Sequence, residues 1–204
     1  MDQPFSDLDY GLSSLAALFH QDWMLDGDHT ATLDIVLWPE QSPSAVLALR
    51  DDATVVGNLA NDEIEHLWVV ATDEYFVFNA GTGSGAEWIE SVIDRCDGWL
   101  RAHGLDPAGR LARPPGPVFR GAVVPVVNAI IDAHVEDGHL LLARPGLIKC
   151  SELGADNLAL RLLVRIAAAR VLSLTHDQYA QLDALGRQLG CGEFVVSAVE
   201  YLVT

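Results

Sequence analysis

The chain has 204 residues, half of them hydrophobic, and a net charge of −17. This composition provides material for a packed core and excludes general disorder. No apolar run approaches the roughly 18–20 residues that a membrane-spanning helix needs, and the acidic start MDQPFSDLDY lacks the regions of a secretory signal. We therefore expect a soluble cytoplasmic protein.

The negative charge is concentrated in the first half of the chain. Residues 1–104 contain 19 acidic and three basic residues, a net charge of −16, whereas residues 105–204 contain 10 acidic and nine basic residues, a net charge of −1. Such a surface repels nucleic acid and anionic membranes, and it attracts a basic protein and accelerates its association. The simpler interpretation, that the charge only maintains solubility, stays open at this point.

The cysteines and histidines are typical of neither a disulfide framework nor a metal site. Cys96, Cys150 and Cys191 are far apart, form no CxxC pair and lie beside apolar residues or glycine. We expect them to be small buried side chains. The seven histidines form no HxH, HExxH or HxxxH pattern. We therefore expect no metal and no cofactor.

Hydrophobic periodicity predicts a mainly helical first half. Apolar side chains recur at three- and four-residue steps, which place them on one helix face. Residues 31–38 are rich in β-branched side chains, so a short strand and a helical turn ended by Pro39 both stay open. Asn61 is the predicted N-cap of a later helix. The helices predicted in this half are 8–23, 42–59, 61–71 and 86–100, the last of them after a glycine-rich loop at 81–85.

A connection rich in proline and glycine at 104–117 marks the predicted boundary between two modules. This stretch holds four of the nine prolines, which remove backbone donors, and the charge balance changes at the same place. We predict a mainly α fold in which helical modules at 5–104 and 118–204 are joined by this connection, with room for a few short strands.

The second module is also predicted to be helical. Pro125 kinks its first helix or marks the true start of that helix, residues 139–143 form a short strand or a buried turn, and Thr175 caps a helix. The arginines that follow Asp156 are predicted to lie mostly away from the apolar face of their helix. The helices predicted in this half are 118–134, 156–172, 175–189 and 194–203, with a strand as the alternative for the last.

The densest polar cluster beside an apolar stripe follows the first predicted helix. Its members are His20, Gln21, Asp22, Asp26 and Asp28. One interpretation uses the imidazole with the three carboxylates for acid–base chemistry or a hard metal ion, as in a hydrolase. The other places Phe19 and Trp23 in the core, where the polar side chains hold the turn. We favour the second, because no nucleophile motif such as GxSxG lies nearby.

The FHQDW segment at 19–23 and the leucine-rich stretch before it resemble the opening of bacterial contact-dependent growth inhibition immunity proteins. That family often starts with a leucine-rich helix ending in an aromatic–His–Gln–Asp–Trp motif. The later segment 85–89 and the pair Trp99-Leu100 are similar to the closing helix of the family. The resemblance covers about residues 5–104 and does not extend to 118–204.

The resemblance implies an immunity protein rather than an enzyme. Such a protein binds the toxic domain of a bacterial toxin, frequently a nuclease with a basic active-site surface, and neutralises it by direct contact without turnover. An acidic half suits this partner, because opposite charge steers the encounter. Exposed acidic residues are the expected contacts: Asp51, Asp52, Asp62, Glu63, Glu65, Asp73 and Glu74.

Two other functions stay open from the sequence. The first is the hydrolase or metal enzyme that would use the cluster at 20–28. The second is a scaffold or regulatory module in which residues 118–204 bind a helix of another protein or form a homodimer through apolar helices.

Overall fold

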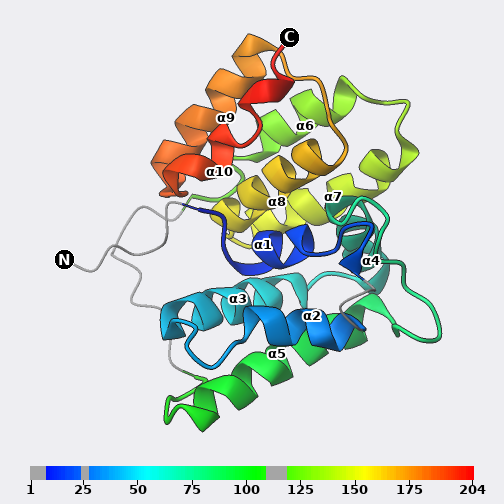
Figure 1. The fold of residues 1–204 in the computed structure, drawn as a ribbon. Coiled ribbons are helices and arrows are strands. Elements are labelled where there is room, and N and C mark those ends of the chain that lie inside the picture. The colour runs from blue at the N-terminus through cyan, green and yellow to red at the C-terminus, as the bar shows by residue number, and fades with distance from the viewer. Residues whose placement is uncertain (1–7, 24–27, 109–118) are drawn as a thin grey trace.

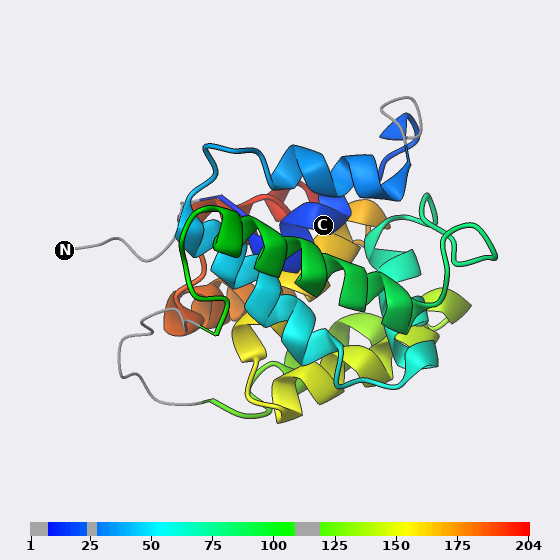
Figure 2. The same cartoon turned by 90° about the horizontal axis from the view of Figure 1, so that it is seen from below.

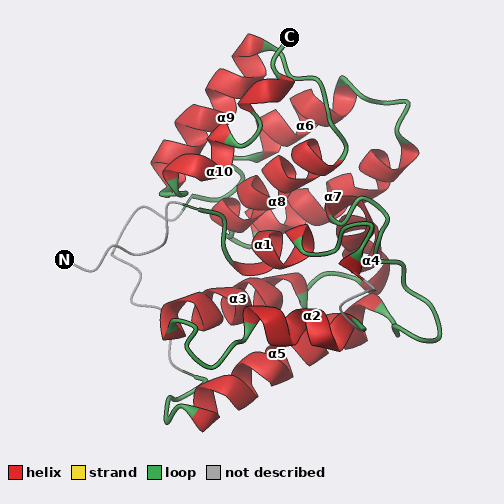
Figure 3. Ribbon diagram, in the orientation of Figure 1, coloured by secondary structure: helices red, strands yellow, loops and turns green. Residues whose placement is uncertain are grey.

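The computed structural model describes residues 8–23, 28–108 and 119–204. Within these ranges the chain is built from helices, and its β pairing consists of the isolated bridges Asn79–Gly83 and Leu174–Val203 (Figure 3). The expected mainly α fold is confirmed. The elements in chain order are α1 (Gly11–Ala17), α2 (His29–Val36), α3 (Pro43–Val56), α4 (Asn61–Ala71), α5 (Gly85–Ala102), α6 (Val124–Asp132), α7 (Gly138–Glu152), α8 (Asp156–Ala169), α9 (His176–Leu189), α10 (Glu193–Ser197) and the 3-10 helix η2 (Glu200–Leu202).

Helix α8 lies at the centre of the helices and contacts α1, α4, α7, α9 and α10 (Figure 1). Its side chains are buried on almost every side, and the polar Asp156, Asn157 and Arg161 are among the buried residues. Helix α1 packs between α8 and α3, while α5 packs on α3 and α4 and forms the lower edge of the molecule in Figure 1. Figure 2, seen from below, shows α5 in front of these helices.

The two halves of the sequence share one hydrophobic core. A single cluster of buried side chains runs from Leu12 to Leu202, and α4 and α3 of the first half pack directly on α7 of the second. The sequence on the two sides of the predicted boundary at 104–117 therefore packs into the same core. Of the predicted connection at 104–117, residues 109–117 lie outside the described residues, as does Val118.

The first two helices differ from the predicted elements. The helix predicted over 8–23 is wrong in length: α1 ends at Ala17, because the backbone turns and brings Phe19 and Trp23 back into the core. The strand considered for 31–38 is also wrong, because these residues belong mostly to α2. The carboxylate of Asp28 caps α2 by accepting hydrogen bonds from the backbone N–H groups of Thr30 and Ala31 at 2.9 and 3.0 Å.

Asn61 does not cap its own helix, contrary to the prediction. Ala60 occupies the N-cap position of α4, and its backbone N–H donates to the Glu63 carboxylate at 2.8 Å. The side-chain oxygen of Asn61 instead accepts a hydrogen bond from the backbone N–H of Ala86 in α5, at 2.9 Å. The beginnings of α4 and α5 are thereby joined side by side.

The strand or buried turn predicted at 139–143 is wrong, because α7 runs without interruption from Gly138 to Glu152. Leu140, Ala143 and Leu147 are buried at helical spacing, which outweighs the proline inside the helix. Pro145 leaves the carbonyl of residue 141 without its intrahelical donor, and both residues lie on the exposed side of the helix.

The end of the chain is only partly as predicted. Thr175 caps α9 through the backbone N–H of Gln178, as expected. Pro125 stands in the first turn of α6 and so marks its start. The single helix predicted over 194–203 is replaced by the short α10 and η2. The strand considered as an alternative is limited, in the described residues, to one isolated bridge between Val203 and Leu174.

Candidate functional site

The FHQDW segment has two aromatic residues in the core and three polar residues at the surface. Phe19 and Trp23 are buried, whereas His20, Gln21 and Asp22 are exposed. The Phe19 ring packs edge-on against Trp23, with ring centroids 5.1 Å apart. The segment therefore holds the fold through its aromatic residues, as the structural interpretation expected.

Trp23 also supports the turn that follows α4. Its indole N–H donates a hydrogen bond to the backbone carbonyl of Tyr75 at 2.9 Å, and Phe19 packs edge-on against Phe76 at 4.9 Å. Since Phe76 is fully buried, this turn is fixed from beneath. The neighbouring aromatic rings of the same cluster are those of Trp68, Phe78 and Trp88.

The residues proposed for hydrolysis are not assembled into a site in the described residues. The carboxylate of Asp28 caps α2, and the imidazole Nδ1 of His20 accepts from the backbone N–H of Asp22 at 3.3 Å. Asp26 lies outside the described residues. Across the part of the chain that the structure describes, no group of three or more His, Cys, Asp or Glu side chains is placed to hold a metal ion.

The acidic candidates differ widely in exposure. Asp52 is buried, so the expectation that it lies at the surface is wrong. Asp51 is half-buried, and the Glu65 carboxylate accepts from the backbone N–H of Gly85 at 3.1 Å. Asp62 is exposed at the beginning of α4 and makes no hydrogen bond or ion pair within the described ranges. This leaves Asp62 as the most accessible candidate in its helix.

The remaining candidates bind basic residues of the other half. Glu63 pairs with Lys149 at 3.3 Å, and Asp73 and Glu74 pair with Arg170 at 3.3 and 2.7 Å. These partners lie about 90 residues away in sequence. Part of the negative charge of the first half is therefore neutralised within the molecule, by basic residues of the second half.

Two further exposed acids on α5 were missing from the predicted contacts. Glu90 and Asp94 stand four residues apart on the outer face of α5, and neither has a hydrogen-bond or ion-pair partner among the residues described. The hydrophobic periodicity of the sequence could have identified these two acids as exposed, because both lie opposite the apolar stripe that contains Val92 and Cys96. Because both side chains are exposed and lie on the same side of the helix, their charges add to one another.

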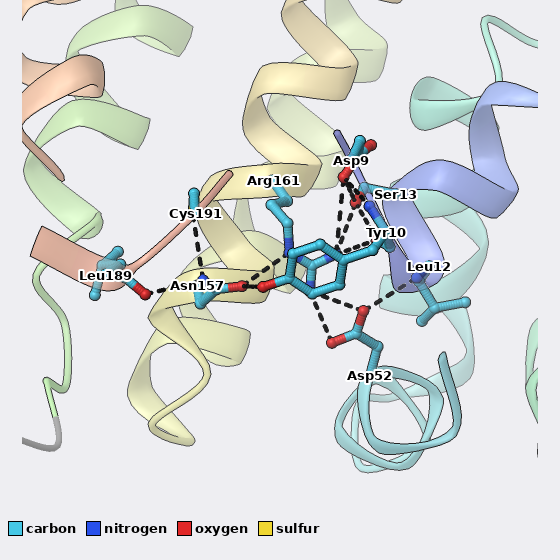
Figure 4. A network of polar contacts seen from close by, with 9 residues as sticks. All are labelled: Asp9, Tyr10, Leu12, Ser13, Asp52, Asn157, Arg161, Leu189 and Cys191. Carbon is cyan, nitrogen blue, oxygen red and sulfur yellow. Dashed lines mark hydrogen bonds and ion pairs between the residues drawn. The ribbon is translucent and has the colours of Figure 1, made fainter. Parts of the chain in front are cut away.

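The most extensive polar cluster is buried and is centred on Arg161 of α8 (Figure 4). This side chain lies off the stripe of Leu158 and Leu162, as predicted, but it is only 1% exposed, because neighbouring helices cover this side of α8 as well. Its Nη2 donates to both carboxylate oxygens of Asp52 at 2.9 and 2.8 Å, and its Nε donates to the Asn157 side chain at 2.8 Å. Its Nη1 donates to the Ser13 hydroxyl at 2.8 Å and to the Tyr10 carbonyl.

The buried positive charge of Arg161 is compensated by Asp52, by the Tyr10 ring and by Asp9. The guanidinium carbon lies 4.0 Å from the centre of the Tyr10 ring, and Asp9 lies 4.0 Å from Nη1. Burial alone would lower the pKa of Arg161, but Asp52, Tyr10 and Asp9 together hold it above its ordinary value. Burial raises the pKa of Asp9, against its hydrogen bond from Ser13. The cluster thus fixes α1 between α3 and α8, which is a structural role.

The three cysteines are expected to be poorly reactive in the folded protein. Burial raises the pKa of Cys96 and Cys150 to about 12 and that of Cys191 to about 11. Iodoacetamide at pH 8 should therefore label the native chain on the order of 100-fold more slowly than the chain in urea. Half-buried Cys191 should react first. Rapid labelling of one native thiol, located by mass spectrometry, would contradict this expectation.

No known protein-family model matches the chain, and neither a curated protein nor a solved structure does. Among the described helices, none is both long and apolar enough to cross a bilayer.

Proposed function

We propose that this protein is an immunity protein, which binds a basic bacterial toxin domain and neutralises it by direct contact without turnover. The observation that carries the proposal is the uncompensated negative charge of the first half. Even after the ion pairs to the second half, Asp62, Glu90 and Asp94 remain exposed without a positive partner in the described part of the chain. Open negative charge of this kind attracts and orients a basic protein.

The FHQDW segment supports the proposal through its sequence resemblance alone. In the proposed family this motif closes the first helix, whereas here α1 ends at Ala17 and the aromatic residues of the motif hold the turn after α4. A rigid helical body suits a protein that acts by occupying a surface, because little entropy is lost on binding. The nuclease activity of the toxin is part of the proposal and follows from the resemblance alone.

The proposal is tested by co-expression with a toxin domain encoded beside the gene of this chain. We expect the toxin to arrest growth when it is expressed alone, and growth to recover when this chain is present. The purified pair should elute as one complex. If no neighbouring toxin domain is bound or neutralised, the proposal fails.

Charge reversal on α5 gives a sharper test of how the partner is attracted. Asp94→Lys should slow association with the toxin roughly tenfold at low salt, and the difference should shrink at high salt because exposed charges are screened. The matched control is Glu152→Lys, which makes the same charge change at an exposed position of the second half. Equal association rates for both variants in stopped-flow measurements would show that α5 does not contribute to the attraction of the toxin.

A further inference from the structure

An ion cluster joins three separate segments at the end of α8. Arg170 follows the last residue of α8, and its guanidinium pairs with Asp137 at 2.9 Å, Glu74 at 2.7 Å and Asp73 at 3.3 Å. Although burial opposes the charged form of Asp137, hydrogen bonds from Arg170 hold the pKa of that carboxyl below its ordinary value. One guanidinium thus fixes both the turn after α4 and the beginning of α7.

The backbone around this cluster is strained at three non-glycine residues. Asp73, Glu74 and Val171 have φ angles of 51°, 64° and 50°, in the left-handed region. This conformation is costly for a β-branched residue such as valine. The side chain of Val171 is also 66% exposed, so burial does not offset the strain. Val171 is therefore held in an unfavourable conformation with its methyl groups in water.

Each of the three segments that the ion cluster joins also carries an exposed apolar side chain. Tyr75 is 42% exposed and follows Glu74, Val135 is 57% exposed and lies two residues before Asp137, and Val171 follows Arg170. The three come from three different segments that the ion pairs hold together. We call them, with the ion cluster, the Arg170 surface. Tyrosine and arginine, both present at this surface, are among the residue types enriched in interaction hot spots.

The Arg170 surface keeps an excess of negative charge. Its three carboxylates, Asp73, Glu74 and Asp137, bind one guanidinium, that of Arg170. The exposed Glu136 adjoins Asp137 in sequence, and the charge of Arg165 interacts with Asp73. Four negative and two positive charges leave a net charge of −2. A cationic side chain of a partner is therefore attracted to this position, and its aliphatic neighbours find apolar groups around it.

We propose that the Arg170 surface binds a protein segment that presents an arginine or lysine between aliphatic side chains. This inference rests on the proposed function, since it names the surface through which the basic partner is held. Val171, Tyr75 and Val135 supply apolar contact, while Glu74 and Glu136 accept hydrogen bonds from the incoming cation.

A peptide titration followed by amide NMR tests the surface without the toxin. The probe is acetyl-Leu-Arg-Leu-Arg-Leu-amide, and its control carries glutamine in place of arginine. We expect saturable shifts at the amides of Tyr75, Val135 and Val171, with an affinity roughly tenfold higher for the arginine peptide. Absence of these shifts, or equal shifts with the glutamine peptide, would overturn the inference.

Val171→Gly separates binding from folding. Glycine adopts a positive φ without strain, so the melting temperature should equal or exceed that of the parent chain. Peptide affinity should nevertheless fall roughly fivefold, because the apolar contact is lost. Tyr75→Ala should weaken binding in the same direction. Unchanged peptide affinity in both variants would contradict the inference.

A binding measurement with the toxin itself distinguishes the Arg170 surface from the immunity function. If the toxin is neutralised and Val171→Gly binds it as tightly as the parent chain does, the Arg170 surface is wrong and the immunity function stands. If the peptide binds at this surface and no toxin is bound, the immunity function fails and the surface stands.

Discussion

Replacement of Asp52 by asparagine is expected to lower the free energy of unfolding by about 3–5 kcal/mol. The change removes the negative charge that faces Arg161, which is almost completely buried and cannot lose its own charge. Breaking a buried ion pair from one side leaves an uncompensated charge, and this costs far more than an exposed pair is worth. For a chain of this size the melting temperature should fall by about 10 °C. Urea unfolding followed by circular dichroism measures the effect.

Two comparisons isolate the charge at Asp52. Asp94→Asn makes the same chemical change at an exposed position of α5 and should alter stability by less than about 0.5 kcal/mol. Combining Asp52→Asn with Arg161→Met should lower the free energy of unfolding by clearly less than the sum of the two single changes. The reason is that Arg161→Met removes the positive charge that Asp52→Asn leaves unpaired. Strictly additive costs would show that the pair is not coupled.

Gly11→Ala should destabilise the protein by about 3 kcal/mol or more. A Cβ atom at this position would stand 2.0 Å from the Asp52 carboxylate oxygen Oδ2 and 3.2 Å from Arg161 Nη1. The backbone φ of Gly11 is also +64°, which costs an L-residue about 1–2 kcal/mol. That Oδ2 atom accepts a hydrogen bond from the backbone N–H of Leu12, so it cannot move away freely. Thermal and urea unfolding should agree on the loss.

The matched control for Gly11→Ala is Gly98→Ala. Gly98 lies inside α5, and a Cβ atom there would meet nothing within 4 Å. Alanine should therefore stabilise α5 by about 0.5–1 kcal/mol, because glycine is the poorer helix former. Opposite signs for the two substitutions are expected, and similar effects would mean that the close approach at Gly11 does not constrain the chain.

The helical elements were largely predictable, because their apolar spacing is regular. The pattern predicts α3, α4, α5, α8 and α9 within a few residues of their observed bounds. It is misleading where tertiary contacts overcome local preference, as in α7, where burial of Leu140 and Leu147 carries a helix through Pro145. It also misplaces Asn61, whose side chain finds a better partner in α5.

The polar network could not be predicted in detail, although one signal was present. Leu160 lies on the opposite side of α8 from Leu158 and Leu162, which predicts packing neighbours on both sides of the helix. A charge that such packing buries must be paired. The identity of its partners depends on which elements come together, and Asp52 is separated from Arg161 by 109 residues. Local periodicity carries no information on that pairing.

The position of α1 has a consequence for synthesis on the ribosome. Tyr10 leaves the ribosome early, whereas Arg161, to which its carbonyl is bonded, follows 151 residues later. At about 5–20 residues per second, this delay amounts to about 8–30 s. During that interval the nascent acidic half lacks both the charge that neutralises Asp52 and helix α8, on which α1 packs. The growing chain is therefore most exposed to aggregation and proteolysis just before α8 emerges.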